Sequence, residues 1–263
     1  MRGGIAVLFS VAAVLLTLPA VAATFDGLDL NLVGTSELST LGPSPALTLT
    51  PSSGGVGAAW LTTPVSTTST FVTTFSFDLS SPGGLGMADG FALVFHNAGT
   101  SALGSGGGNI GVDLPDTATA GGAVAAELQT FWNTYGIVQN TDANGGPFGN
   151  SQGLGTDLSG TSQITGTETV TYDPVTHTVS QTMSLVADGN SFAFNASAIF
   201  DLQAQFGPTM TVGLTGATGG GVSNQVITSW TLTAPVPEPE SYAMMLAGLG
   251  LTALAVRRRS RMS

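Results

Sequence analysis

A strict alternation of large apolar and small polar residues over residues 71–79 most constrains what this chain can fold into. Successive side chains of a β-strand point to opposite faces, so a period of two predicts a half-buried strand. One face carries Phe71, Thr73, Phe75, Phe77 and Leu79. Similar patterns predict strands over residues 28–33, 46–49, 169–172, 179–185, 209–214 and 227–232. Between the termini no segment has a convincing helical period, although residues 201–205 fit one short helical turn.

Turn-forming residues separate the predicted strands. Asp173-Pro174 and Asp188-Gly-Asn190 are typical turn sequences, and the chain contains 37 glycines. It has no cysteine, so burial and backbone pairing must hold the fold together without disulfide bonds. Many short antiparallel strands predict an all-β domain over residues 24–233, either a sandwich of two antiparallel sheets or a jelly roll. The segment 136–161 is rich in glycine, asparagine and serine, and we expect it to form one long loop.

The charges are distributed very unevenly along the chain. Its five lysine and arginine residues are Arg2, Arg257, Arg258, Arg259 and Arg261, so residues 3–256 contain neither type. A nucleic acid or an anionic lipid is therefore excluded as a partner of this region, because no basic side chain is available to meet a phosphate. A divalent cation or a neutral polyhydroxyl compound fits better.

The N-terminus has the pattern of a secretory signal peptide. Arg2 precedes an apolar run over residues 5–18 and the small residues Ala20-Val-Ala-Ala23. We expect residues 1–23 to be removed, with cleavage after Ala22 or Ala23.

The C-terminus has three parts. A linker over residues 234–241 contains Pro237, Glu238 and Pro239, an apolar segment covers 242–256, and a basic tail covers 257–263. Fifteen helical residues span roughly 22 Å, less than the ~30 Å hydrocarbon core, but flanking arginines can reach the interface. The basic tail is expected to remain cytoplasmic.

This arrangement resembles the PEP-CTERM sorting signal of Gram-negative bacteria. The resemblance implies a transmembrane helix that anchors the protein transiently in the inner membrane. It also implies recognition by an exosortase and delivery to the cell surface or medium. A plain C-terminal anchor is the alternative.

Two further stretches, residues 88–97 and 124–133, each read as a buried strand with polar residues at one end. The first offers Asp89 and the second ends in Phe131 and Asn133. A carboxylate, an amide and an aromatic face suit a sugar, because hydroxyl groups need oriented partners and the C–H face of the ring stacks on an aromatic side chain.

The order of motifs resembles a legume-type (L-type) lectin over roughly residues 25–233. Residues 88–90 resemble the A-D-G motif of that family, and residues 124–133 resemble V-A-V-E-F-D-T-F-x-N. Further similar segments are 57–65, 107–111, 171–176, 213–219 and 227–230. The resemblance implies a concanavalin-like sandwich that binds carbohydrate, and a cis peptide bond between Ala88 and Asp89 if the site is functional.

The resemblance also implies roles for individual residues. Asp89 would accept hydrogen bonds from two sugar hydroxyls, and the backbone N–H of Gly108 would donate one. Asn133 would donate through its side-chain amide, and Phe131 would stack on the sugar. The loop containing Gly220 and Gly221 would determine which sugar fits. The structural alternatives are a turn-capping Asp89, a core Phe131 and an ordinary turn residue at Asn133.

The metal site of the family is where this chain departs from the pattern. The family binds calcium and a transition metal through an E-x-D pair, a downstream aspartate and a histidine. Glu127 matches the glutamate, but Gln129 replaces the aspartate and residues 136–161 contain no histidine. We therefore expect no transition metal. Calcium remains possible through oxygen ligands from Glu127, Asn133 and Asp142.

The sequence does not favour an enzyme. A glycosidase needs two carboxylates across a cleft, and Glu127 lacks a partner at position 129. The residues 106–111 fit G-x-G-x-x-G, but no helix follows them.

The sequence therefore predicts an exported carbohydrate-binding protein whose target is an extracellular polysaccharide, such as an exopolysaccharide of the producing cell. The main alternative is a structural surface or matrix protein that keeps the fold without binding sugar. A glycoside hydrolase is a more remote alternative. The sequence identifies neither the sugar nor the oligomeric state.

Overall fold

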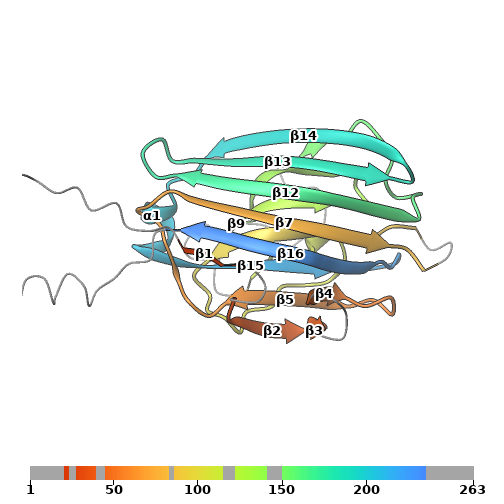
Figure 1. Cartoon of the computed structure of the whole chain (residues 1–263), viewed down its shortest axis with the longest axis horizontal. Helices are drawn as coiled ribbons and strands as arrows, with labels where there is room; N and C mark the ends of the chain where they lie inside the picture. Colours follow the sequence, from red (N-terminus) through yellow and green to blue (C-terminus); the bar gives the residue numbers. More distant parts are fainter. Residues whose placement is uncertain are drawn as a thin grey trace, which may run out of the picture.

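Two antiparallel sheets packed face to face make up the protein (Figure 1). This computed structural model describes residues 21–23, 28–39, 45–82, 86–114, 122–140 and 150–234. The first sheet, here called the β7 sheet, has the strand order β14-β13-β12-β7-β16-β4-β3, with β1 paired to β16 beside it. Its strands are β1 (Val21–Ala23), β3 (Glu37–Ser39), β4 (Ala46–Thr50), β7 (Phe71–Ser80), β12 (Gln163–Asp173), β13 (Thr178–Ala187), β14 (Asn190–Ile199) and β16 (Asn224–Ala234).

The second sheet, here called the β8 sheet, has the order β11-β10-β9-β8-β15-β5-β2, with β6 paired to β15. Its strands are β2 (Leu30–Gly34), β5 (Val56–Leu61), β6 (Val65–Ser66), β8 (Gly90–His96), β9 (Ala123–Gln129), β10 (Thr134–Asn140), β11 (Gln152–Gly153) and β15 (Thr209–Ala217). The predicted all-β sandwich is confirmed, and each strand predicted from alternation is present. The predicted helical turn is α1 (Leu202–Phe206), whose N-cap Asp201 accepts a hydrogen bond from the Ala204 N–H.

One predicted boundary is wrong. The segment 136–161, expected to be one long loop, contains strand β11 and residues 136–140 of β10, which pairs along its whole length with β9. Gly136, Gln139 and Asn140 obscure the alternation of this strand, and the pairing with β9 stabilises it instead.

Two apolar cores explain why β8 and β9 are buried on both faces. Phe91, Leu93 and Phe95 on β8 face the main core between the sheets. Ala92 and Val94 face a smaller core on the other side of the β8 sheet, under the segment 98–114. That segment is attached to the sheet by a 2.8 Å hydrogen bond from Trp60 Nε1 to the Ala102 carbonyl oxygen.

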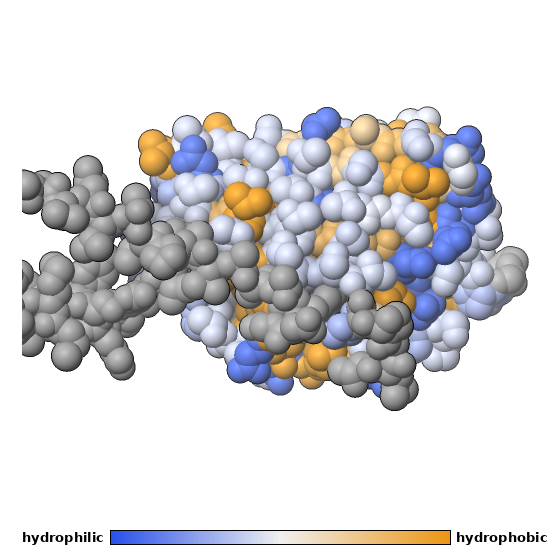
Figure 2. Space-filling view, viewed as in Figure 1, coloured by the Kyte–Doolittle hydropathy of each residue, from blue (hydrophilic) through white to orange (hydrophobic). Residues whose placement is uncertain are grey.

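The exposed face of the β7 sheet is formed mostly by hydroxyl side chains of intermediate hydropathy (Figure 2). Two cross-strand hydroxyl pairs lie on it, Thr74 with Thr169 at 2.9 Å and Ser76 with Thr167 at 3.1 Å. Cross-strand pairs of this kind stabilise neighbouring strands.

The two ends of the chain carry the predicted signal peptide and the predicted transmembrane segment. Strand β1 lies inside the predicted signal peptide and pairs with the end of β16, with Val21 opposite Ala234. Cleavage after Ala22 or Ala23 stays a prediction. Within the described residues no helix is long and apolar enough to cross a membrane. The predicted transmembrane segment 242–256, the basic tail and Pro237, Glu238 and Pro239 lie outside the described residues.

Candidate functional site

A hollow of about 440 Å³ brings together most of the predicted site residues. It is lined by Asp89, Gly107, Gly108, Phe131, Trp132, Gly219, Gly220 and Gly221. These residues come from four segments that meet at one end of the β8 sheet, because β8 pairs with β9 on one side and with β15 on the other. Five glycines in the lining leave backbone groups accessible, and Asp89 is the charged residue among them.

Asp89 is fixed by backbone hydrogen bonds on both sides of the β8 strand. Its N–H donates to the Ala217 carbonyl oxygen at 2.9 Å, and its carbonyl oxygen accepts from the Thr130 N–H at 2.9 Å. The Ser223 hydroxyl donates to the Ala88 carbonyl oxygen at 2.7 Å. The Ala88–Asp89 peptide bond is cis, as expected.

The Asp89 side chain is a buried carboxylate that faces the hollow. It is 5% exposed, and its Oδ2 has no hydrogen-bond partner within the part of the chain that the structure describes. Burial raises the pKa of Asp89 to about 6, because removal from water disfavours the charged form. At neutral pH the carboxylate is mostly ionised and keeps an acceptor oxygen for a ligand.

Gly219 makes room for this carboxylate. A Cβ atom at position 219 would lie 2.8 Å from Asp89 Oδ2 and 3.1 Å from the Gly107 Cα. Any larger residue would therefore push into the charged group or the opposite backbone. The Gly107 N–H donates to the Thr218 carbonyl oxygen at 3.0 Å and so joins the short 3-10 helix η2 (Gly107–Asn109) to the end of β15.

Two consecutive aromatic residues form the other wall. Phe131 is 49% exposed and Trp132 is 43% exposed, and their rings lie 5.2 Å apart at 84°. A strand would turn one of them inward, but the turn after β9 exposes both. Phe131 is therefore not a core residue. Trp132 is not among the residues predicted for the site, although an aromatic pair directly after a buried strand is a signal for it.

Asn133 lies beside this hollow and does not line it. Its side-chain Nδ2 donates to Asp157 Oδ1 at 3.0 Å, and its Oδ1 accepts from the Leu158 N–H at 2.6 Å. These bonds attach the turn to the segment 154–158. A role for the Asn133 amide as a sugar donor stays a prediction, and it would require the bond to Asp157 to be replaced.

The residues predicted to bind calcium are arranged for other partners. Glu127 is fully buried, and its carboxylate accepts hydrogen bonds from the Ser151 hydroxyl and, at 2.8 Å, from Gln129 Nε2. Burial raises the pKa of Glu127 to about 7. Donors therefore face both carboxylate oxygens, and Asn133 is bonded as described above. Asp142 lies outside the described residues, and the described part contains no group of three or more metal-binding side chains.

The arrangement at Glu127 does not fit a cation. Hydrogen-bond donors already occupy both carboxylate oxygens of Glu127, which a metal would need as free ligands.

Both histidines have structural surroundings. His96 is fully buried against Trp60, with ring centroids 4.2 Å apart, and its Nδ1 accepts from the Ala98 N–H. Burial lowers the pKa of His96 to about 4. His177 Nδ1 lies 3.6 Å from Oδ1 of Asp201, the N-cap residue of α1.

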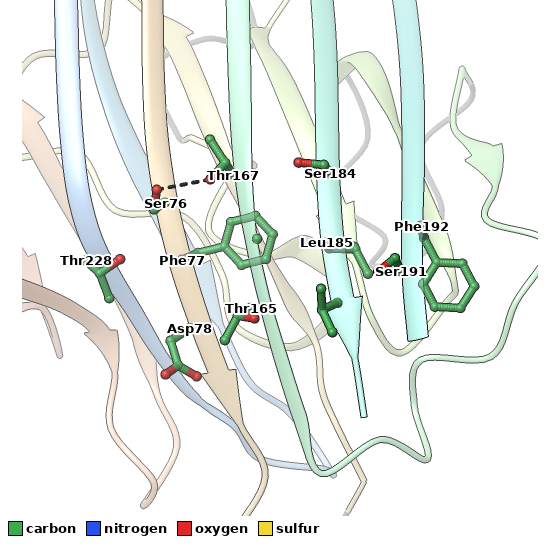
Figure 3. A pocket seen from close by; sticks show the side chains of 12 residues that line it. Ser76, Phe77, Asp78, Thr165, Thr167, Ser184, Leu185, Ser191, Phe192 and Thr228 are labelled. Atoms are coloured by element: carbon green, nitrogen blue, oxygen red, sulfur yellow. Dashed lines mark hydrogen bonds between the residues drawn. The ribbon is translucent and has the colours of Figure 1, made fainter. Parts of the chain in front are cut away.

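A second hollow of about 460 Å³ lies on the β7 sheet (Figure 3). Hydroxyl side chains of β7, β12, β13, β14 and β16 line it, together with Asp78 and the apolar residues Phe77, Leu185, Val186 and Phe192. The Asp78 carboxylate accepts hydrogen bonds from Gln163 Nε2 at 3.2 and 3.4 Å. This hollow lacks the exposed aromatic pair and the buried unpartnered carboxylate of the first, which is the better candidate for a ligand site.

Comparison with known proteins identifies the family. The legume lectin domain model matches residues 23–244, which is most of the chain. This chain belongs to the legume lectin family. It is 31% identical over 233 residues to Agglutinin-2 of Cladrastis kentukea, covering 80% of this chain and 77% of that protein. It is 25% identical over 223 residues to the lectin alpha chain of Lablab purpureus, covering 76% of this chain and 75% of that one.

Solved lectin structures share the fold of this lectin domain. A Lotus tetragonolobus seed lectin superimposes with a TM-score of 0.65 at 21% identity, covering 83% of this chain and 100% of that chain. A Bauhinia forficata lectin in complex with GalNAc superimposes with a TM-score of 0.64 at 23% identity, covering 82% of this chain and 98% of that chain. Family and fold thus support a carbohydrate-binding, lectin-like protein that is not an enzyme.

The C-terminal sorting signal is also matched. The PEP-CTERM protein-sorting motif covers residues 235–259. It indicates that this lectin is exported and sorted by an exosortase.

Proposed function

We propose that the hollow at Asp89 binds a saccharide of an extracellular polysaccharide made by the producing cell. The observation that carries this proposal is the buried, unpartnered Oδ2 of Asp89 in the same hollow as two exposed aromatic rings. The carboxylate would accept hydrogen bonds from two hydroxyls, and the Gly108 N–H would donate one. Phe131 would stack on the C–H face of the sugar, and Gly220 and Gly221 would limit its size.

A glycan array tests this proposal. Purified full-length protein, applied with and without calcium, should bind a subset of glycans, whereas the Asp89→Asn variant should not. The second candidate, a structural surface protein that no longer binds sugar, is favoured by Gln129 in place of an acidic residue and by the bonded amide of Asn133. This second candidate predicts that the folded parent protein binds no glycan on the array.

We expect sugar binding to be independent of calcium. Glu127 is bonded to donors, and the backbone of Asp89 is positioned by Ala217 and Thr130 without help from an ion. Glycan affinity measured by calorimetry should therefore change less than about twofold when EDTA is added, well under the ~1.4 kcal/mol of a tenfold change. Loss of binding in EDTA and its recovery with calcium would show that Asp142 or another residue outside the described part completes a metal site.

The sorting proposal makes a prediction about topology. We propose that residues 242–256 span the inner membrane transiently, that residues 257–263 stay in the cytoplasm, and that an exosortase acts near Pro237, Glu238 and Pro239 before release to the surface. Replacing the four C-terminal arginines with serine should weaken membrane retention before sorting, because positive charges hold that end in the cytoplasm. Cell fractionation measures the effect, and unchanged retention and processing would refute the anchor role.

A further inference from the structure

The charge of the site restricts the kind of saccharide that it can hold. All 16 acidic residues lie between positions 26 and 240, whereas the five arginine and lysine residues lie outside residues 3–256. The lining of the hollow contains one charged side chain, Asp89. A uronic acid or a sulfated sugar would therefore meet repulsion and no counter-charge.

The carboxylate of Asp89 is suited to a positively charged group. Its Oδ2 is buried and without a partner among the described residues, and Gly219 places no side-chain atom against this oxygen. A buried carboxylate gains more from a charge-assisted hydrogen bond than from a neutral one, because the low local dielectric strengthens the attraction.

The aromatic wall favours the same kind of ligand. Phe131 and Trp132 lie nearly perpendicular, at 84°, and nearly half of each side chain is exposed. Aromatic faces, that of tryptophan most of all, attract cations, and two rings at right angles can contact one group from two directions. A stacking platform for a neutral sugar needs one such face, and this site offers two.

We infer that the preferred ligand is a saccharide with a free amino group, that is, a non-acetylated hexosamine unit whose ammonium lies between the Asp89 carboxylate and the Phe131–Trp132 pair. This inference rests on the proposed sugar-binding function and specifies its ligand class. It goes beyond recognition of hydroxyls, since the amine supplies a charge that a neutral sugar lacks.

The test compares matched oligosaccharides on the full-length protein. Calorimetry at pH 7 measures the affinity for tetramers of four sugars: glucosamine, N-acetylglucosamine, glucose and galacturonic acid. A second series of titrations compares galactosamine with N-acetylgalactosamine and galactose. We expect an amino sugar to bind at least tenfold more tightly than its acetylated and neutral counterparts. We also expect its affinity to fall as salt is raised and the uronic acid to show no binding.

Variants separate a specific site from general attraction to an acidic protein. Asp89→Asn and Trp132→Leu should each remove most of the preference for the amine. Asp78→Asn removes the same charge from the other hollow and should retain that preference. Equal losses in Asp78→Asn and Asp89→Asn would overturn the inference. Equal binding of amino, acetylated and neutral sugars would also overturn the inference, but the proposed sugar-binding function would stand. If no sugar bound at all, both the inference and the proposed function would be wrong.

Discussion

Asp89→Asn should weaken glycan binding about ten- to a hundredfold. The substitution keeps the shape of the side chain but replaces an anionic acceptor with a neutral amide. Hydrogen bonds to charged groups contribute about 1.5–3 kcal/mol, which corresponds to this range. Binding of a monosaccharide at roughly millimolar affinity would then become undetectable by calorimetry.

The fold should tolerate this change. The hydrogen bonds that hold residue 89 come from its backbone, through Ala217 and Thr130, so asparagine retains them. Urea unfolding should show a loss of stability far smaller than the loss of binding. Asp78→Asn is the matched control, and it should bind glycan like the parent. Parent-like binding by Asp89→Asn would exclude this carboxylate from the site.

The second large effect concerns Glu168, a carboxyl group in the main core. It lies on β12 opposite Phe75 of β7 and Met183 of β13, and it is fully buried. Gln181 Nε2 donates to its Oε1 at 3.0 Å, and Oε2 has no partner among the described residues. Burial raises the pKa of Glu168 from 4.5 to about 8.

The free energy of unfolding should therefore fall as the pH rises. A folded-state pKa above the unfolded value means that the contribution of Glu168 is fully present below about pH 4.5 and is lost as the pH rises through about 8. The slope is about 1.4 kcal/mol per pH unit, so the loss between pH 6.5 and 8 is roughly 2 kcal/mol. Glu127, with its pKa near 7, acts in the same direction over the lower part of this interval. His96, whose pKa is lowered to about 4, acts in the opposite direction only below about pH 6.5.

Urea unfolding of Glu168→Gln at pH 6.5 and 8 measures this effect. The variant should gain roughly 2 kcal/mol relative to the parent between the two pH values, because glutamine carries no proton to lose. Glu37→Gln, which removes a carboxyl group from an exposed side chain on β3, is the matched control and should follow the parent curve. Parallel curves for Glu168→Gln and the parent would show that Glu168 does not control alkaline stability.

Local sequence was sufficient for most strands because their period reflects one buried face. Residues 71–79 show this directly, and β7 extends the prediction by only one residue. The strands β8 and β9 lack alternation because both of their faces are buried, and their apolar runs with polar residues at one end predict them instead. The strand β10 was missed because backbone pairing with β9 stabilises a sequence with little pattern of its own.

The strand pattern, the lack of basic residues between positions 3 and 256, and the chemistry of Asp89, Phe131 and the glycines all follow from the sequence. Which of these groups meet depends on the folded arrangement of the strands. Gly219 lies 130 positions from Asp89, and it adjoins that carboxylate because β15 pairs with β8. The turn after β9 exposed Trp132. Asp157 and Leu158 bind the Asn133 amide, and Ser151 joins Gln129 at the Glu127 carboxylate. Pairing between distant strands and loops sets these contacts, and no local period in the sequence encodes them.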